Sequence, residues 1–268
     1  MHTVEAGLIV AADGRRSRVA DLAGIPLKTK KNARFAYFAY YRNLSLVEPA
    51  CSQMWFLEPD MAYIFPNDAE VTLAAAMPDM GKLAQWKADT EGSFLRLFSD
   101  LPKAPALKNA ERISPFIGML DMTNSTRRVS LPGLALVGDA AIAADPLAGV
   151  GCGWAFQSAE WLVDATADSL DDRTQLDAAL AKYRRRHRWE LGGHEFFISD
   201  FSTGRSYNPL EKLLFSAAAR DQDCADHVTA FGSRLIGAMS LLSPGALLRA
   251  SAVNLKHRRS QGNPNGQG

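Results

Sequence analysis

The chain has 268 residues, of which 47% are hydrophobic and 22% charged, a composition typical of a globular protein with a sizeable core. A formal net charge of +1 leaves no basic excess for a general nucleic-acid binder, so we expect no nucleic-acid partner. Three cysteines, at positions 51, 152 and 224, give neither a disulfide framework nor metal-ligand spacing. No apolar run reaches the roughly 20 residues of a membrane span, and the first residues lack a signal-peptide layout. We therefore expect a cytoplasmic protein without a transmembrane segment.

The first predicted element is a strand over Thr3–Ala12 that stops at Asp13-Gly14. A short helix follows over Ser17–Ala23, with Gly24 as its C-terminal cap. A carboxylate and a glycine at the end of an apolar strand form a first candidate binding turn.

The next part of the chain predicts an antiparallel sheet with one packed face and one face free to line a cavity. Turn residues separate several of its strands, as at Pro66-Asn67-Asp68. Helical spacing follows over Gly81–Asp100, and the chain then returns to the sheet over Arg112–Met122. The strands are expected over Arg34–Leu44, Gln53–Leu57, Met61–Phe65 and Glu70–Ala76.

A second strand–turn–helix pattern starts with the apolar run Leu134–Val137, which predicts a buried parallel strand. It ends at Gly138-Asp139, and Pro146, Gly149 and Gly151 follow before a helix. Glycines let a backbone approach a ligand, and a helix N-terminus presents free N–H groups and a partial positive charge. The pattern predicts a binding edge for a polar or anionic group, with Asp139 as a hydrogen-bond acceptor.

The last third of the chain predicts helices and a short disordered tail over 260–268, rich in Gly, Asn and Gln. The helices are expected over Gln175–Phe197, Pro209–Arg220, Cys224–Met239 and Pro244–His257.

Each candidate residue also has a structural interpretation. Asp13 and Asp139 could simply cap the helices that follow them, and Cys152 is expected to be a small buried thiol. The aromatic residues of the sheet cannot all line a cavity, because side chains alternate between the faces of a strand. The five histidines show no metal spacing, so we expect no metal. No nucleophile–base pair is evident, and catalytic residues stay unassigned.

The two turn motifs resemble those of FAD-dependent monooxygenases of the para-hydroxybenzoate hydroxylase type. Ala12-Asp13-Gly14-Arg15-Arg16-Ser17 resembles their Asp-Gly motif, and Gly138-Asp139-Ala140-Ala141 with Pro146, Gly149 and Gly151 resembles their Gly-Asp motif. Asp145-Pro146-Leu147-Ala148-Gly149 with Ser158 looks closer to the geranylgeranyl-reductase and flavin-halogenase branch.

The resemblance implies a role for each matching position. Asp139, after Gly138, would bind the ribityl hydroxyls, and Pro146 would lie against the isoalloxazine. The backbone of Gly149, Val150 and Gly151 would face the N1–C2=O edge, where reduced flavin carries negative charge. Asp13 and Gly14 would lie near the pyrophosphate. Tyr63 and Phe65, in the segment Ala62–Pro66, match the sheet segment placed over the flavin and are the expected substrate-binding residues.

Three departures from the family pattern affect what the resemblance implies. The Arg that often ends the Asp-Gly motif is Ala20, which bears on NAD(P)H use, and the His that often follows Gly-Asp-Ala-Ala is Ile142. No Gly-x-Gly-x-x-Gly unit for the FAD diphosphate occurs in the chain. The alternatives are a truncated product, a separate chain that supplies this N-terminal FAD-binding unit, or a misassigned start.

The resulting expectation is an α/β (α+β) protein: an incomplete FAD-binding Rossmann-like domain with an inserted antiparallel-sheet substrate domain and a helical C-terminus. The parts are residues 1–25 and 130–172, the insertion 26–129, the helical region 173–259 and the tail. The implied function is FAD-dependent hydroxylation of a small organic substrate through a flavin hydroperoxide, with NAD(P)H as electron donor. The alternatives are a flavin-dependent C=C reductase, a halogenase, or a truncated non-catalytic remnant that needs a partner or a missing N-terminus.

Overall fold

A computed structural model describes residues 3–49 and 51–261 and divides the chain into two compact units. Unit 1 comprises Met1–Lys30, Asn124–Ser199 and Tyr207–Gly268, and unit 2 comprises Lys31–Thr123 and Asp200–Ser206. The C-terminal helices therefore belong to the same unit as the two turn motifs. Each unit is described by itself.

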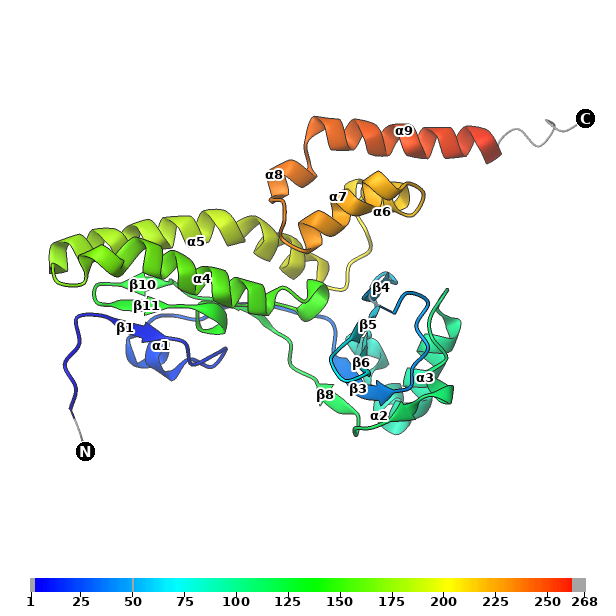
Figure 1. The fold of residues 1–268 in the computed structure, drawn as a ribbon, viewed down its shortest axis with the longest axis horizontal. Helices are drawn as coiled ribbons and strands as arrows, with labels where there is room; N and C mark the ends of the chain where they lie inside the picture. Colours follow the sequence, from blue (N-terminus) through cyan, green and yellow to red (C-terminus); the bar gives the residue numbers. More distant parts are fainter. Residues whose placement is uncertain (1–2, 50, 262–268) are drawn as a thin grey trace, which may run out of the picture. The chain divides into compact units, whose positions relative to one another are not determined.

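Unit 1 contains a small sheet in the order β1-β11-β10 (Figure 1). β1 (Ile9–Ala11) runs parallel to β11 (Leu134–Leu136), and β10 (Ser130–Leu131) pairs with β11 antiparallel. The buried parallel strand predicted over Leu134–Val137 is confirmed. The strand predicted over Thr3–Ala12 is wrong in length, because β1 pairs only where it faces β11.

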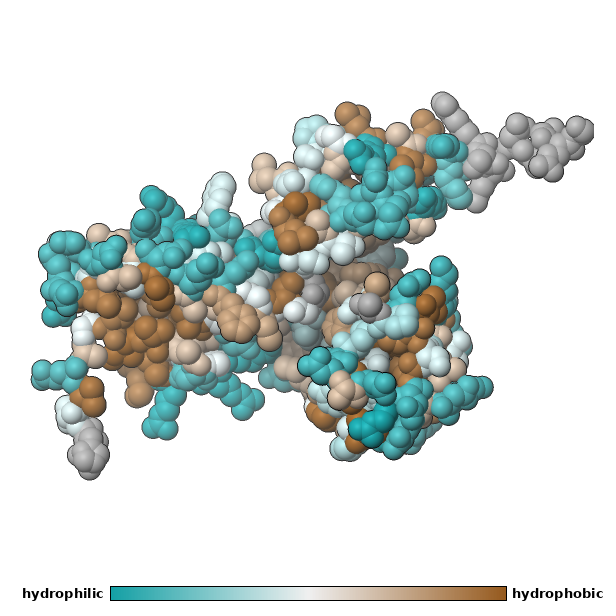
Figure 2. Space-filling model, viewed as in Figure 1, coloured by the Kyte–Doolittle hydropathy of each residue, from teal (hydrophilic) through white to brown (hydrophobic). Residues whose placement is uncertain are grey.

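The position of β1 at the edge of its sheet leaves apolar side chains exposed. Ile9 is 52% and Val10 is 47% exposed, although parallel strands are usually buried on both faces. Phe156 and Val163 of the helix after β11 are also exposed. Apolar surface gathers around β1 and this helix in Figure 2.

A second sheet of unit 1 has the order β12-β9-β2 and is antiparallel throughout. Its strands are β2 (Lys28–Lys30), β9 (Asn124–Thr126) and β12 (Ile142–Ala143).

Two long helices, α4 (Gly151–Thr166) and α5 (Arg173–Phe201), pack on each other in unit 1 (Figure 1). The Tyr183 hydroxyl of α5 donates to the Leu136 carbonyl at 2.7 Å, which fixes α5 on β11. The other helices of this unit are α1 (Arg18–Leu22), η3 (Gly138–Ala140), η4 (Pro146–Ala148), η5 (Ala167–Ser169), α6 (Pro209–Ala218), α7 (Gln222–Gly232), α8 (Ala238–Leu241) and α9 (Pro244–Gln261).

The C-terminal helices differ from the sequence expectation in two places. The helix predicted over Cys224–Met239 is two helices, because α7 ends at Gly232 and Arg234 adopts a left-handed φ of 63°. The predicted tail begins later than residue 260, since α9 continues to Gln261. The rest of that tail, 262–268, lies outside the described residues.

Unit 2 is a six-stranded antiparallel sheet in the order β4-β5-β6-β3-β7, with β8 also paired to β3. One face packs against α2 and α3, and alternate residues such as Ile64, Ala74 and Ala76 meet Trp86 and Phe94 there. The strands are β3 (Ala36–Arg42), β4 (Gln53–Phe56), β5 (Met61–Pro66), β6 (Val71–Met77), β7 (Glu111–Arg112) and β8 (Ile117–Met119). The predicted packed face is confirmed.

The helix predicted over Gly81–Asp100 is interrupted. η1 (Met80–Lys82) leads into α2 (Leu83–Ala88), and α3 (Thr90–Asp100) starts afresh after Asp89. Asp89 has φ −148° and ψ 78°, and its carboxylate accepts the Gly92 N–H at 2.8 Å. An aspartate that caps a new helix ends the previous one, which hydrophobic spacing does not reveal. A further turn, η2 (Leu107–Asn109), precedes β7.

Within residues 3–49 and 51–261, no helix combines the length and apolar character needed to cross a bilayer. The same residues hold no group of three or more His, Cys, Asp or Glu side chains suited to a metal ion.

Candidate functional site

The two predicted turns lie at the same edge of one sheet in unit 1. β1 and β11 are parallel, with Ala11 opposite Leu136, and the Val137 N–H donates to the Ala11 carbonyl at 3.0 Å. Asp13 and Asp139 follow the carboxyl ends of these neighbouring strands. The structure therefore brings the two acidic turns to a single strand edge, where open α/β sheets place ligands.

The Asp13 carboxylate is engaged with its own turn. Its Oδ2 accepts the Val19 N–H at 3.1 Å. Hydrogen bonds from the Ser17 hydroxyl and the Val19 amide hold the pKa of the Asp13 carboxyl below its ordinary value. Gly14 beside it has a φ of 81°, a conformation that favours glycine. The helix-capping interpretation therefore describes what Asp13 does in this structure.

Asp139 lies in a different environment. It is exposed in the one-turn helix η3, and no side chain caps that turn. In the part of the chain that the structure describes, its carboxylate has no hydrogen bond or ion pair. The two acidic turns therefore differ: Asp139 has its acceptor oxygens free for a ligand, whereas Asp13 is occupied.

The turn before Asp139 is held against α4. The Gly138 N–H donates to the buried Ser158 hydroxyl at 2.9 Å, and that hydroxyl donates to the Ala155 carbonyl at 2.9 Å. Gly138 has a φ of 55°, and a Cβ at this position would lie 3.0 Å from the Ala155 Cβ. Glycine is needed here both for its conformation and for the close approach of the turn to the helix.

The loop between β12 and α4 has its own supports. Asp145 caps η4 by accepting the Leu147 N–H at 2.8 Å, and the Asp145 N–H donates to the Asn124 side chain at 2.7 Å. Pro146 is the first residue of η4. Gly149 then turns the chain in the left-handed region, with φ 66° and ψ 17°. These contacts fix where α4 begins.

The N-terminus of α4 carries no side-chain cap. Its N-cap residue is Val150, whereas α1, α3, α6 and α7 are all capped by side chains. The first N–H groups of a helix have no partner inside it, and a 16-residue helix adds a partial positive charge. A Cβ on Gly151 or Gly153 would meet nothing within 4 Å, so this end is open. It can stabilise an anionic or carbonyl edge of a ligand.

Cys152, in the first turn of α4, is exposed. The expectation of a buried thiol is wrong, because the helix turns this position away from the residues that pack on the sheet.

The predicted substrate residues lie in unit 2. Tyr63 and Phe65 share one face of β5 and stack with ring centroids 4.6 Å apart. Ile64 between them points to the opposite, helix-covered face. The structure thus pairs these two aromatic residues on the face away from α2 and α3, and their substrate role stays a prediction.

The sequence interpretation missed Arg127, whose side chain is only 3% exposed. It donates to the Arg15 carbonyl at 3.3 Å and to Asp21 at 2.7 Å, and so holds the turn that follows Asp13. The sequence offered little signal for this contact, because Arg127 and Arg15 are 112 positions apart. Ser158 and Asn124 are further supports whose contacts could not be read from local spacing.

A family model described as an FAD binding domain matches residues 1–190. The chain is also 23% identical over 207 residues to the digeranylgeranylglycerophospholipid reductase of Methanococcus vannielii, which covers 74% of this chain and 50% of that protein. The chain thus spans about half the length of this curated relative.

Solved structures with the same fold come from flavoproteins. The flavin-dependent brominase Bmp2 matches with a TM-score of 0.71 and 16% identity, over 96% of this chain and 65% of the other. The flavin-dependent halogenase CmlS gives a TM-score of 0.61 at 18% identity, over 97% and 51%. PqsL of Pseudomonas aeruginosa, described as a probable FAD-dependent monooxygenase, gives 0.57 at 20% identity, over 72% and 57%.

Proposed function

Because the chain belongs to the FAD binding domain family of FAD-dependent oxidoreductases, we propose that it takes part in the hydroxylation of a small organic substrate, with NAD(P)H and O₂ as co-substrates. The observation that carries the proposal is the free carboxylate of Asp139 in η3, a turn that packs on the first half of α4, whose N-terminus has no side-chain cap. A polyol chain needs acceptors such as this carboxylate, and an electron-rich ring edge needs donors such as the helix N–H groups.

The residues of unit 1 fit the flavin half of FAD. Asp139 would accept hydrogen bonds from the ribityl hydroxyls, and the backbone of Gly149, Val150 and Gly151 would face the N1–C2=O edge. Pro146 would lie against the ring, and Asp13 with Gly14 near the pyrophosphate. When bound, FAD supplies the redox and oxygen chemistry that amino-acid side chains lack.

The chain's own contribution to that chemistry is electrostatic. The partial positive charge of α4 favours negative charge at the ring edge in front of it, and it is fixed in place before any ligand arrives. Gly149 would let backbone rather than a side chain approach the ring, whereas Gly138 lets the turn that carries Asp139 approach α4. Tyr63 and Phe65 would give a substrate an aromatic surface.

The ADP half of FAD has no cradle in this sequence, since no Gly-x-Gly-x-x-Gly pattern occurs in it. We propose that a glycine-rich unit outside this sequence, such as one on a separate chain, supplies it. β1 offers a place for such a unit, because it is an edge strand with half-exposed Ile9 and Val10. A further parallel strand there would cover these side chains.

The flavin site is tested by measuring FAD binding to the purified full chain. Binding is monitored through the quenching of flavin fluorescence. Asp139→Asn removes the charge but keeps the size, and the loss of a charge-assisted hydrogen bond, about 1.5–3 kcal/mol, predicts at least tenfold weaker binding. Asp168→Asn is the matched control, since Asp168 is an exposed carboxylate beyond the other end of α4. Equal affinities for the two variants would contradict the assignment. A chain that stays colourless after incubation with FAD would contradict independent flavin binding.

A second candidate is the reduction of a carbon–carbon double bond, which the similarity to a digeranylgeranylglycerophospholipid reductase favours. The two reactions differ in their need for oxygen. NAD(P)H oxidation that consumes O₂ and adds one oxygen atom to the product supports hydroxylation. Substrate reduction that proceeds without O₂ supports the reductase.

A further inference from the structure

A groove opens between α6 and α9 in unit 1, with a volume of about 710 Å³. The lining residues of each helix recur at intervals of three and four, so each helix turns one continuous face to the groove. From α6 these are Pro209, Lys212, Leu213, Ser216 and, just beyond the helix end, Arg220; from α9 they are Ser251, Asn254, Leu255, His257 and Arg258.

The charge of this groove is positive and unbalanced. Lys212, Arg220 and Arg258 line it, and no acidic side chain does. Within the part of the chain that the structure describes, none of these three cations forms an ion pair. The adjacent Glu211 is buried, and its carboxylate accepts the Asn208 N–H at the start of α6.

Neutral partners hold one of these cations in place. The Arg220 guanidinium donates to the Ser216 carbonyl at 2.8 Å and to the Asn254 side-chain oxygen. Asn254 is itself fixed, because its amide donates to the Leu213 carbonyl at 3.0 Å. Since these acceptors carry no charge, Arg220 keeps its full positive charge at the groove, and it is ordered before a ligand binds.

The remaining lining is largely apolar. Pro209, Leu213 and Leu255 give the groove aliphatic surface, and Leu255 is 50% exposed. An aliphatic floor beside unpaired cations is complementary to a molecule with an apolar body and an anionic end.

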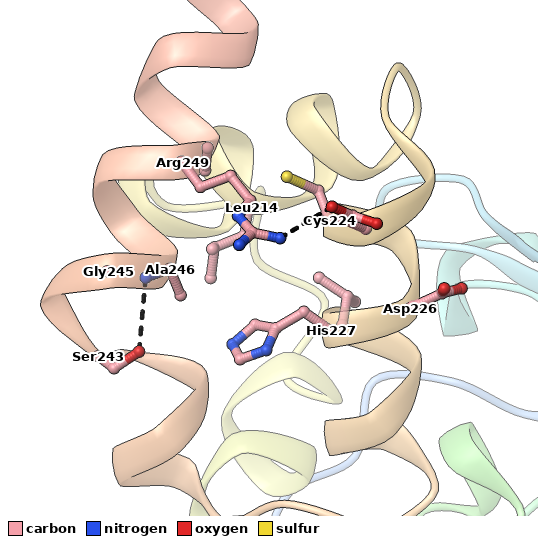
Figure 3. A pocket seen from close by; sticks show the side chains of 11 residues that line it. Leu214, Cys224, Asp226, His227, Ser243, Gly245, Ala246 and Arg249 are labelled. Carbon is pink, nitrogen blue, oxygen red and sulfur yellow. Dashed lines mark hydrogen bonds and ion pairs between the residues drawn. The ribbon is translucent and has the colours of Figure 1, made fainter.

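A second cavity, on another face of α9, differs from the groove in its charge. It has a volume of about 460 Å³ and is lined from α7 and the start of α9 (Figure 3). There Arg249 pairs with Asp223 at 3.0 Å, and Asp226 adds another acidic side chain. Its positive charge is balanced, so it has no comparable preference for an anion.

We propose that the α6–α9 groove binds a single anionic amphiphile, a molecule with an extended aliphatic part and a carboxylate or phosphate head. The aliphatic part lies along Leu213 and Leu255, and the head group lies among the cations that line the groove, with Lys212 and Arg258 as its expected contacts. The groove volume is within the range of roughly 300–1,000 Å³ found for small-ligand sites. A site for one molecule requires such a concave volume, whereas a contact with the flat surface of a bilayer does not. The site is separate from the strand edge of Asp139 and does not depend on FAD.

The test is isothermal titration of the full chain with dodecanoate and with dodecyl phosphate, each kept below its micelle concentration. We expect saturable binding of both anions and at least fivefold weaker binding of uncharged dodecanol. The double variant Lys212→Gln/Arg258→Gln removes two exposed cations that form no hydrogen bond or ion pair among the described residues, so it should fold normally and lose at least fivefold in affinity. Arg249→Gln removes one cation from the same helix outside the groove and should bind within twofold of the parent chain.

Equal binding of dodecanol and dodecanoate, or equal binding by the double variant and Arg249→Gln, would overturn the proposal. A further experiment with lipid vesicles distinguishes a free amphiphile from a lipid in a membrane as the source of the head group. Sedimentation with phosphatidylserine vesicles that depends on Lys212 and Arg258, in a chain that binds neither monomeric anion, would replace the single-molecule site by a membrane-contact surface. Binding of the monomers without sedimentation supports the groove as a site for a free amphiphile.

Discussion

The contact between Gly138 and Ser158 allows a sharp test of how the candidate flavin turn is supported. Ser158→Ala removes a fully buried hydroxyl that accepts the Gly138 N–H at 2.9 Å. The donor is left buried without a partner, which costs about 1–3 kcal/mol, whereas the methyl group of alanine fits the space. We expect the free energy of unfolding to fall by this amount.

The free energy of unfolding is measured by urea unfolding of the full chain, monitored by circular dichroism, with Ser251→Ala as the control. The Ser251 hydroxyl also donates to a helix carbonyl, that of Leu247 at 2.8 Å, but it is exposed and accepts no buried N–H. Its loss should change stability by less than about 0.5 kcal/mol. Because Gly138 positions Asp139, the Ser158 variant should also bind FAD less tightly. Equal unfolding free energies for the two variants would refute the reasoning.

Gly149→Ala places a side chain at φ 66° and should cost about 1–2 kcal/mol in the same unfolding assay, and an unchanged midpoint would argue against a rigid loop. Arg127→Ala should destabilise the chain by about 2 kcal/mol through loss of the Arg15 and Asp21 contacts, and Arg127→Lys should rescue little, because an ammonium cannot reproduce the forked geometry. Burial, with a smaller contribution from the nearby Arg234 charge, lowers the pKa of His187 to about 4. In the unfolded chain His187 therefore binds a proton between pH 6.5 and 4 that it does not bind in the folded chain. The contribution of neutral His187 to the free energy of unfolding is fully present above pH 6.5, and roughly 3 kcal/mol is lost as the pH drops through this window. His187→Phe should reduce that slope in unfolding curves taken at a series of pH values, and part of it should remain, because burial lowers the pKa of His194 to about 4 as well. An unaltered slope would contradict the assignment.

The sequence was most informative where the physical cause is local. Aromatic and turn residues located β3, β5 and β6 of unit 2, and Gly24 marked the end of α1. The break at Asp89 escaped prediction because helical spacing continues through it.

The candidate site was only partly predictable for a similar reason. Both acidic turns were found, but sequence could not distinguish the occupied carboxylate of Asp13 from the free one of Asp139. The difference depends on three-dimensional contacts within each turn. Likewise, Arg127 and Ser158 act on turns 112 and 20 positions away, and no local pattern encodes such contacts.

The edge position of β1 has a consequence for work in solution. Ile9 and Ala11 direct their backbone groups to β11, so the amide and carbonyl of Val10 point to the open side. Such an edge, with apolar side chains beside it, can pair with the same edge strand of a second copy of the chain. By mass action, self-association would then compete with any ligand or partner that covers this edge, so dissociation constants of the isolated chain should be measured at several protein concentrations.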